Sequence, residues 1–228
     1  MSAKVLIKSL VVALTLSGGS NMILAQPDST SIKYMLVFLS PNENTQLGSA
    51  EKQILENDHL RNIGRLSESG ILANAWPIEG GSEVMVLNTS TLAQTEAVLM
   101  NDPAVAENLF YVEILGWRIQ YGGICDPDFP YEMSTYTMIR YLPTNQIASY
   151  KTSVDFDMRT GHQEYINSLI ESNDVIVEGY FGTNDGGILI YKGNALDPLI
   201  EQDVSIKDGY LVANKYTIWL NKGSFCTN

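Results

Sequence analysis

Basic residues are scarce in this sequence, which has 14 lysines and arginines against 26 aspartates and glutamates and a formal net charge of −12. Proteins that bind nucleic acids neutralise phosphates with clustered lysine and arginine, and the sequence contains no such cluster. We therefore exclude nucleic acid as a partner. The same charge argues against binding to anionic membrane surfaces, and an acidic surface is typical of a protein that stays in solution.

Long hydrophobic runs are also missing, except near the N-terminus. There, Lys4 and Lys8 precede a short apolar run, Leu10–Leu16; small residues follow this run, and the bond after Ala25 is a plausible cleavage point. This pattern is typical of a secretory signal peptide, here residues 1–25, because the apolar core is too short for an ordinary membrane span. We expect an exported protein, periplasmic or extracellular, with no membrane contact after signal cleavage. An uncleaved N-terminal anchor is the alternative.

Cysteine and histidine are rare, with two of each. In an exported protein the two cysteines, Cys125 and Cys226, predict one disulfide; two free thiols are the alternative if the segment is not a signal peptide. No histidine lies near either cysteine in the sequence, so we expect no metal site. The sequence also lacks a P-loop, a dinucleotide-binding fingerprint and a nucleophile elbow, and we predict no cofactor.

Hydrophobic periodicity predicts the element order β-α-β-β-α-β over the first half of the chain. The predicted strands are Lys33–Ser40, Ile71–Ile78, Glu83–Asn88 and Leu109–Tyr121, and the predicted helices are Ala50–Gly70, capped by Ser49, and Thr89–Met100. A unit of this order makes a four-stranded antiparallel sheet with both helices on one face. The other face of the sheet then needs a cover.

The same order of elements returns after a connector, Gly122–Glu132. The predicted strands are Tyr136–Leu142, Asp174–Phe181, Ile188–Lys192 and Gly209–Leu220, and the predicted helices are Val154–Asn173 and Ala195–Asp203. We therefore divide the chain after the signal peptide into a first repeat (33–122), a linker (123–134), a second repeat (135–222) and a C-terminal tail (223–228).

Matching residues recur about 102 positions apart, which indicates an internal duplication. The matched pairs are Met35 with Met138, Phe38 with Tyr141, Leu39 with Leu142, His59 with His162, Leu66 with Leu169, Asp102 with Asp203, Leu109 with Leu211, Trp117 with Trp219, and Cys125 with Cys226. Two such units cover each other's sheets, so we predict an α+β barrel with the helices outside, a pseudo-dimer within one chain. The disulfide would lie near the pseudo-twofold axis or tie each terminal segment to the other half. Further oligomerisation is open.

Both histidines lie on the apolar stripes of the two long predicted helices. The stripes are Leu55, His59, Ile63 and Leu66 in the first helix, and Met158, His162, Ile166 and Leu169 in the second. Each repeat therefore places a titratable imidazole on a face that should be buried. Arg61 and Arg65 lie near His59 and either bind an anionic substrate or face solvent.

Four segments of the first half, DHLRNIGRLSESGIL, EGG, VMVLN and NDPAVAENLFYVEILGW, resemble the YCII-related (YciI-like) family of the dimeric α/β-barrel superfamily. The resemblance covers Lys33–Gln120 well and Thr135–Lys222 more loosely, with Val204 where the family pattern has proline. The family's Gly-Pro pair appears as Trp76-Pro77 in one half and Gly179-Tyr180 in the other. The resemblance implies two ferredoxin-like βαββαβ repeats paired into a barrel and a His–Asp dyad in a cleft between helix and sheet. Related proteins include a dechlorinating enzyme and, more distantly, muconolactone isomerases and cofactor-light monooxygenases.

The candidate catalytic residues are His59 with Asp102, and their counterparts His162 with Asp203. A carboxylate that fixes the imidazole tautomer makes histidine a usable general base or acid near neutral pH. Such a pair can abstract a proton next to a carbonyl or assist the hydrolytic loss of a leaving group. We therefore predict a cleft for a small-molecule substrate and an isomerase-like or lyase/hydrolase-like enzyme. The alternative is a non-catalytic ligand-binding or interaction protein, in which the histidines pack and Asp102 only caps a short helix, Pro103–Asn108.

Overall fold

The structure is a computed structural model that describes residues 32–127, 129–145, 152–172, 174–182, 186–192 and 200–227. The predicted signal peptide, residues 1–25, lies outside this part of the chain. Most of the predicted helix Ala195–Asp203 also lies outside it.

The first half contains the predicted strands and helices, together with the short helix that Asp102 was considered to cap. The elements are β1 (Tyr34–Pro41), α1 (Ser49–Glu68), β2 (Leu72–Ile78), β3 (Ser82–Leu87), α2 (Leu92–Leu99), α3 (Pro103–Ala106) and β4 (Phe110–Tyr121). Helix α1 begins one residue earlier than predicted, because Gly48 rather than Ser49 is the N-cap. The Glu51 carboxylate accepts a hydrogen bond of 2.8 Å from the Gly48 N–H, which satisfies a donor at the helix start.

The second half repeats this order. Its elements are β6 (Met133–Pro143), α4 (Thr152–Glu171), β7 (Val175–Phe181), β8 (Gly187–Lys192), α6 (Val204–Lys207) and β9 (Leu211–Asn221). Two short strands were not predicted. They are β5 (Gly123–Ile124), in the predicted linker, and β10 (Phe225–Cys226), in the predicted tail, and they pair with each other.

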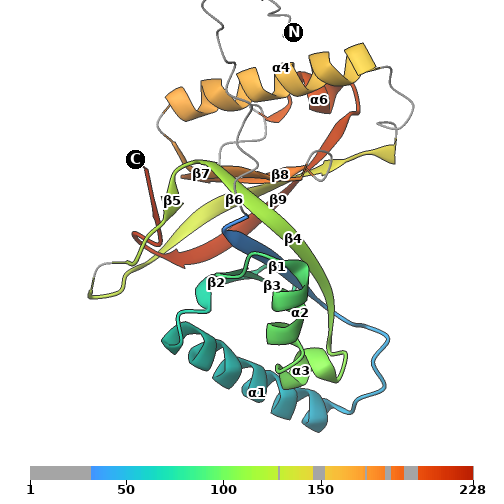
Figure 1. The fold of residues 1–228 in the computed structure, drawn as a ribbon, viewed down its shortest axis with the longest axis vertical. Helices are drawn as coiled ribbons and strands as arrows, with labels where there is room; N and C mark the ends of the chain where they lie inside the picture. Colours follow the sequence, from blue (N-terminus) through green and yellow to red (C-terminus); the bar gives the residue numbers. More distant parts are fainter. Residues whose placement is uncertain are drawn as a thin grey trace, which may run out of the picture. The chain divides into compact units, whose positions relative to one another are not determined.

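The eight long strands form one closed antiparallel barrel in the order β1-β3-β2-β9-β6-β8-β7-β4. Strands of the first half are therefore neighbours in the order β4-β1-β3-β2, and those of the second half in the order β9-β6-β8-β7. Helix α1 lies outside the first group of strands and α4 outside the second (Figure 1). The predicted α+β barrel with external helices is confirmed at this level of detail.

Three apolar clusters hold the barrel together, one inside it and one under each group of helices. The interior cluster includes Leu36, Trp76, Val84, Trp117, Met138, Phe181, Ile190 and Ile218. The cluster under α1 includes Val37, Leu39, Leu66 and Met85, and the cluster under α4 includes Ile139, Tyr141, Leu169 and Leu189. Each strand thus faces the interior and the helices with alternate residues.

The registers correct several of the predicted residue matches by one position. Phe38 belongs to the interior cluster, whereas Tyr141 belongs to the cluster under α4, so these two residues do not match. The match of Trp117 with Trp219 is also wrong, because Trp117 is 1% exposed inside the barrel and Trp219 is 43% exposed. A slip of one residue moves a side chain to the opposite face of a strand. When the two halves are compared by strand pairing and by the face on which each side chain lies, Tyr141 corresponds to Leu39, and Ile218 corresponds to Trp117.

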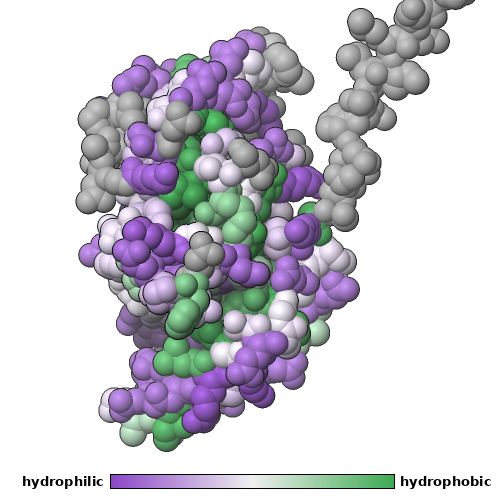
Figure 2. Space-filling view, turned by 90° about the vertical axis from the view of Figure 1, so that its left-hand side faces the viewer, coloured by the Kyte–Doolittle hydropathy of each residue, from purple (hydrophilic) through white to green (hydrophobic). Residues whose placement is uncertain are grey.

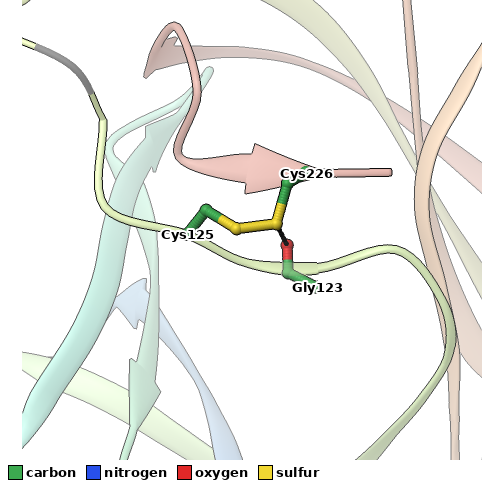
Figure 3. Close-up of a disulfide and its surroundings, with 3 residues drawn as sticks. All are labelled: Gly123, Cys125 and Cys226. Atoms are coloured by element: carbon green, nitrogen blue, oxygen red, sulfur yellow. Dashed lines mark hydrogen bonds between the residues drawn. A yellow bond between two sulfur atoms is a disulfide. The ribbon is translucent and has the colours of Figure 1, made fainter. Parts of the chain in front are cut away.

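A disulfide joins Cys125 to Cys226, as predicted from the cysteine count (Figure 3). It ties the segment after β4 to the end of the chain, beside the β5–β10 pair, and Gly123 O lies 3.9 Å from the sulfur of Cys226 (Figure 3). Phe225, next to Cys226, packs edge-on against Trp76 with ring centroids 5.7 Å apart. The disulfide therefore fixes a segment that contributes to the interior cluster.

Hydrophilic residues dominate the surface where the two long helices lie, at the top and bottom of Figure 2, and hydrophobic residues show between them. This distribution is expected for amphipathic helices that cover the outside of a barrel. Within the described ranges, no helix combines the length and apolarity needed to cross a membrane.

Candidate functional site

His59 of α1 contacts Asp102, as the sequence predicted. Its Nδ1–H donates to Asp102 Oδ2 at 2.8 Å. The other carboxylate oxygen, Oδ1, caps α3 by accepting from the N–H groups of Ala104 and Val105 at 3.0 and 3.2 Å. Asp102 therefore fills both predicted roles at once, as partner of the histidine and as helix cap, and it links α1 to α3.

The second nitrogen of His59 also contacts a carboxylate. Nε2 lies 3.3 Å from Glu83 Oε2 on β3. Ionised carboxylates only accept hydrogen bonds, so both ring nitrogens carry protons when both contacts form. Burial lowers the pKa of His59, but the hydrogen bonds to Asp102 and Glu83 outweigh it and raise that pKa to about 9. His59 is 4% exposed, and neither ring nitrogen is left for a substrate.

His162 of α4 makes the corresponding contact in the second half. Its Nδ1–H donates to Asp203 Oδ2 at 2.6 Å, and Asp203 Oδ1 caps α6 by accepting from the Ser205 N–H at 2.9 Å. Ser205 Oγ donates in turn to Met158 O at 2.7 Å, which links α6 to α4. The two halves therefore build the same His–Asp pair in the same way.

The halves differ at the second ring nitrogen. In the first half, Glu83 on β3 pairs with Leu39 on β1. In the second half, Gly187 on β8 pairs with Tyr141 on β6, so Gly187 occupies the position that matches Glu83. Gly187 supplies no carboxylate, and within the described part of the chain no group hydrogen bonds to Nε2 of His162. A Cβ at Gly187 would lie 2.5 Å from the carbonyl oxygen of Gly179, so the close approach of β7 excludes a side chain here.

A cavity of about 390 Å³ opens beside His162, between α4 and the outer face of β6, β8 and β7. We call it the His162 cavity; its lining includes Arg118, Tyr141, His162, Glu178, Tyr180 and Gly187. Its volume is within the range of small-molecule sites. The side chain of His162 is 22% exposed against 5% for that of His59. A cavity between helix and sheet thus lies beside the histidine of the second half.

Two buried polar groups in this lining have no hydrogen-bond partner among the described residues. They are the Tyr141 hydroxyl and Oε2 of Glu178. Burial raises the pKa of Glu178 to about 7 and, together with the nearby charges of Tyr165, Asp203 and Glu178, raises the pKa of Tyr141. An unpaired buried polar atom costs roughly 1–3 kcal/mol, so two of them in one cavity point to a functional site.

The sequence reasoning missed Glu178, Tyr141 and Arg118. A signal for Glu178 was present, since it is the one charged residue in the otherwise uncharged strand VIVEGYF. Arg61 and Arg65, considered for an anionic substrate, have local partners instead: Arg61 pairs with Asp58 and Arg65 donates to Asn62. In the described part of the chain, no three potential metal ligands come together. The catalytic roles of the two His–Asp pairs stay predictions.

No family model matches the sequence, and no curated protein matches it. The resemblance to the YCII-related family is therefore not confirmed. Three solved structures are similar at a low level. They are a candidate monooxygenase from Lactobacillus acidophilus NCFM (TM-score 0.44, 10% identity, 85% of this chain and 95% of that chain), a candidate chlorite dismutase (0.47, 8%, 84% and 95%), and a candidate monooxygenase from Fusobacterium nucleatum subsp. nucleatum (0.47, 8%, 83% and 94%). We infer neither a family nor an activity from similarities of this size.

Proposed function

We propose that the chain is an exported, YCII-like small-molecule enzyme, built from two ferredoxin-like repeats as an intrachain pseudo-dimer, with general acid–base chemistry in the His162 cavity. One observation carries the proposal. His162 has one ring nitrogen held by Asp203 and borders a cavity, whereas both ring nitrogens of His59 contact carboxylates. The disulfide supports export, because disulfides persist in oxidising compartments.

The residues of the His162 cavity have complementary roles in this proposal. Asp203 accepts from Nδ1–H of His162, which leaves Nε2 as the basic nitrogen of the neutral ring. Glu178, with a pKa raised to about 7 by burial, supplies a second group that exchanges protons near neutral pH. The Tyr141 hydroxyl donates to an oxygen on which negative charge develops. This set suits proton transfer next to a carbonyl, or protonation of a leaving group, as in isomerase-like and lyase/hydrolase-like reactions.

His59 and Asp102 have a structural role in the same proposal. They tie α1, α3 and β3 together through contacts that include Glu83, and the ring is buried. Removing one partner of a buried ion pair costs roughly 3–5 kcal/mol, because the other charge is left buried. The first half then stabilises the barrel while the second half holds the site.

The test uses residues 26–228 in D₂O with neutral ring ketones and lactones. NMR monitors the exchange of hydrogen for deuterium at the carbon next to the carbonyl. Removal of a general base lowers the rate by roughly 10²–10⁴, and we expect His162→Gln to lose at least a hundredfold. The matched variant His59→Gln should retain the rate and lose thermal stability.

The opposite pattern, a lost rate in His59→Gln and a retained rate in His162→Gln, would overturn the assignment of the site. Binding of a ring ketone in the His162 cavity without any exchange that depends on His162 would instead favour the alternative, a non-catalytic ligand-binding protein on the same barrel.

A further inference from the structure

We propose that the His162 cavity takes a ring-bearing organic anion whose carboxylate is bound by Arg118. This inference rests on the proposed site and names the class of molecule that enters it. Arg118 belongs to β4, in the first half of the chain, but borders the cavity of the second half because β4 pairs with β7. The site is thus completed across a seam of the barrel.

Arg118 is positioned by its neighbours on both strands. Its guanidinium lies 5.9 Å from the centre of the Tyr180 ring, and Arg118 and Tyr180 face each other in the β4–β7 register. The preceding residue, Trp117, is buried inside the barrel, so the alternation of the strand directs Arg118 to the outside. A guanidinium held over an aromatic face by a cation–π contact keeps its N–H donors free for an acceptor.

Charge is the second argument. Of the five arginines in the sequence, Arg61 and Arg140 pair with the carboxylates of Asp58 and Glu113. Arg118 has no carboxylate partner within the described part of the chain, although acids outnumber bases by 26 to 14. A carboxylate is the group that a guanidinium binds in a bidentate way. An arginine that lines a cavity and has no carboxylate partner within the described part of this acidic chain therefore indicates an anionic ligand.

A row of four residues across neighbouring strands sets the shape of the ligand. Arg118 pairs with Tyr180, Tyr180 with Gly187, and Gly187 with Tyr141. Strands lie about 4.8 Å apart, so the backbones of Arg118 and Tyr141 are separated by about 14 Å. A ligand that consists of one ring with a polar group at each end can therefore contact the side chains of Arg118 and Tyr141 at the same time. The glycine in the middle of the row carries no side chain, so no bulky group stands between the two tyrosines.

The first half lacks this arrangement. The corresponding row runs through Leu39, Glu83 and Pro77, and it offers a carboxylate, occupied by His59, where the second half has Gly187. At the far end of the second row the Tyr141 hydroxyl is unpaired, and Oε2 of Glu178, two residues before Tyr180 on β7, is unpaired beside the row; both require hydrogen-bonding groups on the ligand. The ligand therefore carries a carboxylate at the Arg118 end and a hydroxyl or carbonyl oxygen at the other.

The experiment compares two probes that differ in charge and share their ring and hydroxyl, 4-hydroxybenzoate and 4-hydroxybenzamide. Binding to residues 26–228 is measured by titration calorimetry at pH 6, below the raised pKa of Glu178, about 7, so that this acid is mostly neutral. We expect the benzoate to bind at least tenfold more tightly than the benzamide. Arg118→Met should remove that difference and leave the benzamide unchanged.

Two further variants keep the test interpretable. Arg61→Met removes an exposed arginine paired with Asp58 and should leave both probes unchanged, and Arg118→Lys, which retains a charge, should keep part of the preference. Equal affinity for the two probes, or absence of binding by both, would overturn the inference. The exchange assay with neutral ketones does not involve Arg118, so the proposed acid–base function stands or fails separately.

Discussion

Raising the pH from 6 to 10 should weaken the fold through His59 by about 3 kcal/mol. In the fold, hydrogen bonds to Asp102 and Glu83 overcome the effect of burial and raise the pKa of His59 from 6.5 to about 9. Each pKa unit corresponds to about 1.4 kcal/mol, which gives the figure of about 3 kcal/mol. The folded pKa is above the unfolded one, so this stabilisation is complete below pH 6.5 and is lost as the pH rises through 9.

The assay uses the fact that the chain has two histidines. Carbon–proton NMR spectra of the imidazoles contain two sets of signals, and His162→Gln assigns the set of His59. Urea unfolding of the unmodified chain and of His59→Gln at pH 6, 8 and 10 then measures the linked free energy. We expect His59 to titrate near pH 9, and the advantage of the unmodified chain over His59→Gln to shrink by about 3 kcal/mol over this range.

A pKa of His59 at or below 6.5 would refute the reasoning, because burial would then outweigh both carboxylates. Glu83→Gln provides an internal check. It removes one of the two negative charges next to the ring while Asp102 keeps its contact at 2.8 Å. The pKa of His59 should fall in this variant but stay above 6.5. An unchanged pKa would assign the whole effect to Asp102.

Three other predictions concern the disulfide and the His162 cavity. Reducing the Cys125–Cys226 bond, which closes a separation of 101 residues, should lower the free energy of unfolding in urea by about 4–5 kcal/mol; an unchanged midpoint would contradict this. Burial raises the pKa of Glu178 from 4.5 to about 7, so the stability of the unmodified chain relative to Glu178→Gln should fall by about 3 kcal/mol as the pH rises from 4.5 through 7; a flat difference would refute the burial argument. Tyr141→Phe removes a hydroxyl without a partner among the described residues, so its unfolding free energy should stay within about 1 kcal/mol while deuterium exchange slows at least tenfold; equal rates would exclude a role in the site.

The element order was predictable because each strand and helix carries its own period of apolar residues. The exact match between the halves was not. Helices α1 and α4 match as predicted through His59 and His162, whereas the strands before them, β1 and β6, match one residue away from the predicted pairs. The connections between strand and helix differ in length by one residue, and loops tolerate such changes. A strand does not tolerate a change in length by one residue, because such a shift moves every following side chain to the opposite face of the sheet.

The histidine–aspartate pairs were predicted from their recurrence in both halves and from the resemblance to the YCII-related family, because separation along the sequence does not show which side chains touch. The rest of the cavity was not. Arg118 reaches the His162 cavity across the β4–β7 seam, and nothing in a linear sequence indicates which strand of one half borders the other. The role of Gly187 appears only by contrast with Glu83 at the matching position, and that match depends on the correct strand register.

Recurrence of the pair in both halves is weak support for catalysis, because the fold itself accounts for it. Asp102 and Asp203 each cap a short helix with one carboxylate oxygen and hold a histidine with the other. Losing either aspartate would therefore uncap a helix, at a cost of roughly 0.5–2 kcal/mol, whether or not any chemistry took place. The second ring nitrogen is the better criterion. Where Glu83 occupies it the histidine is a buried structural cation, and where Gly187 stands instead the same ring faces a cavity that holds two unpaired polar groups.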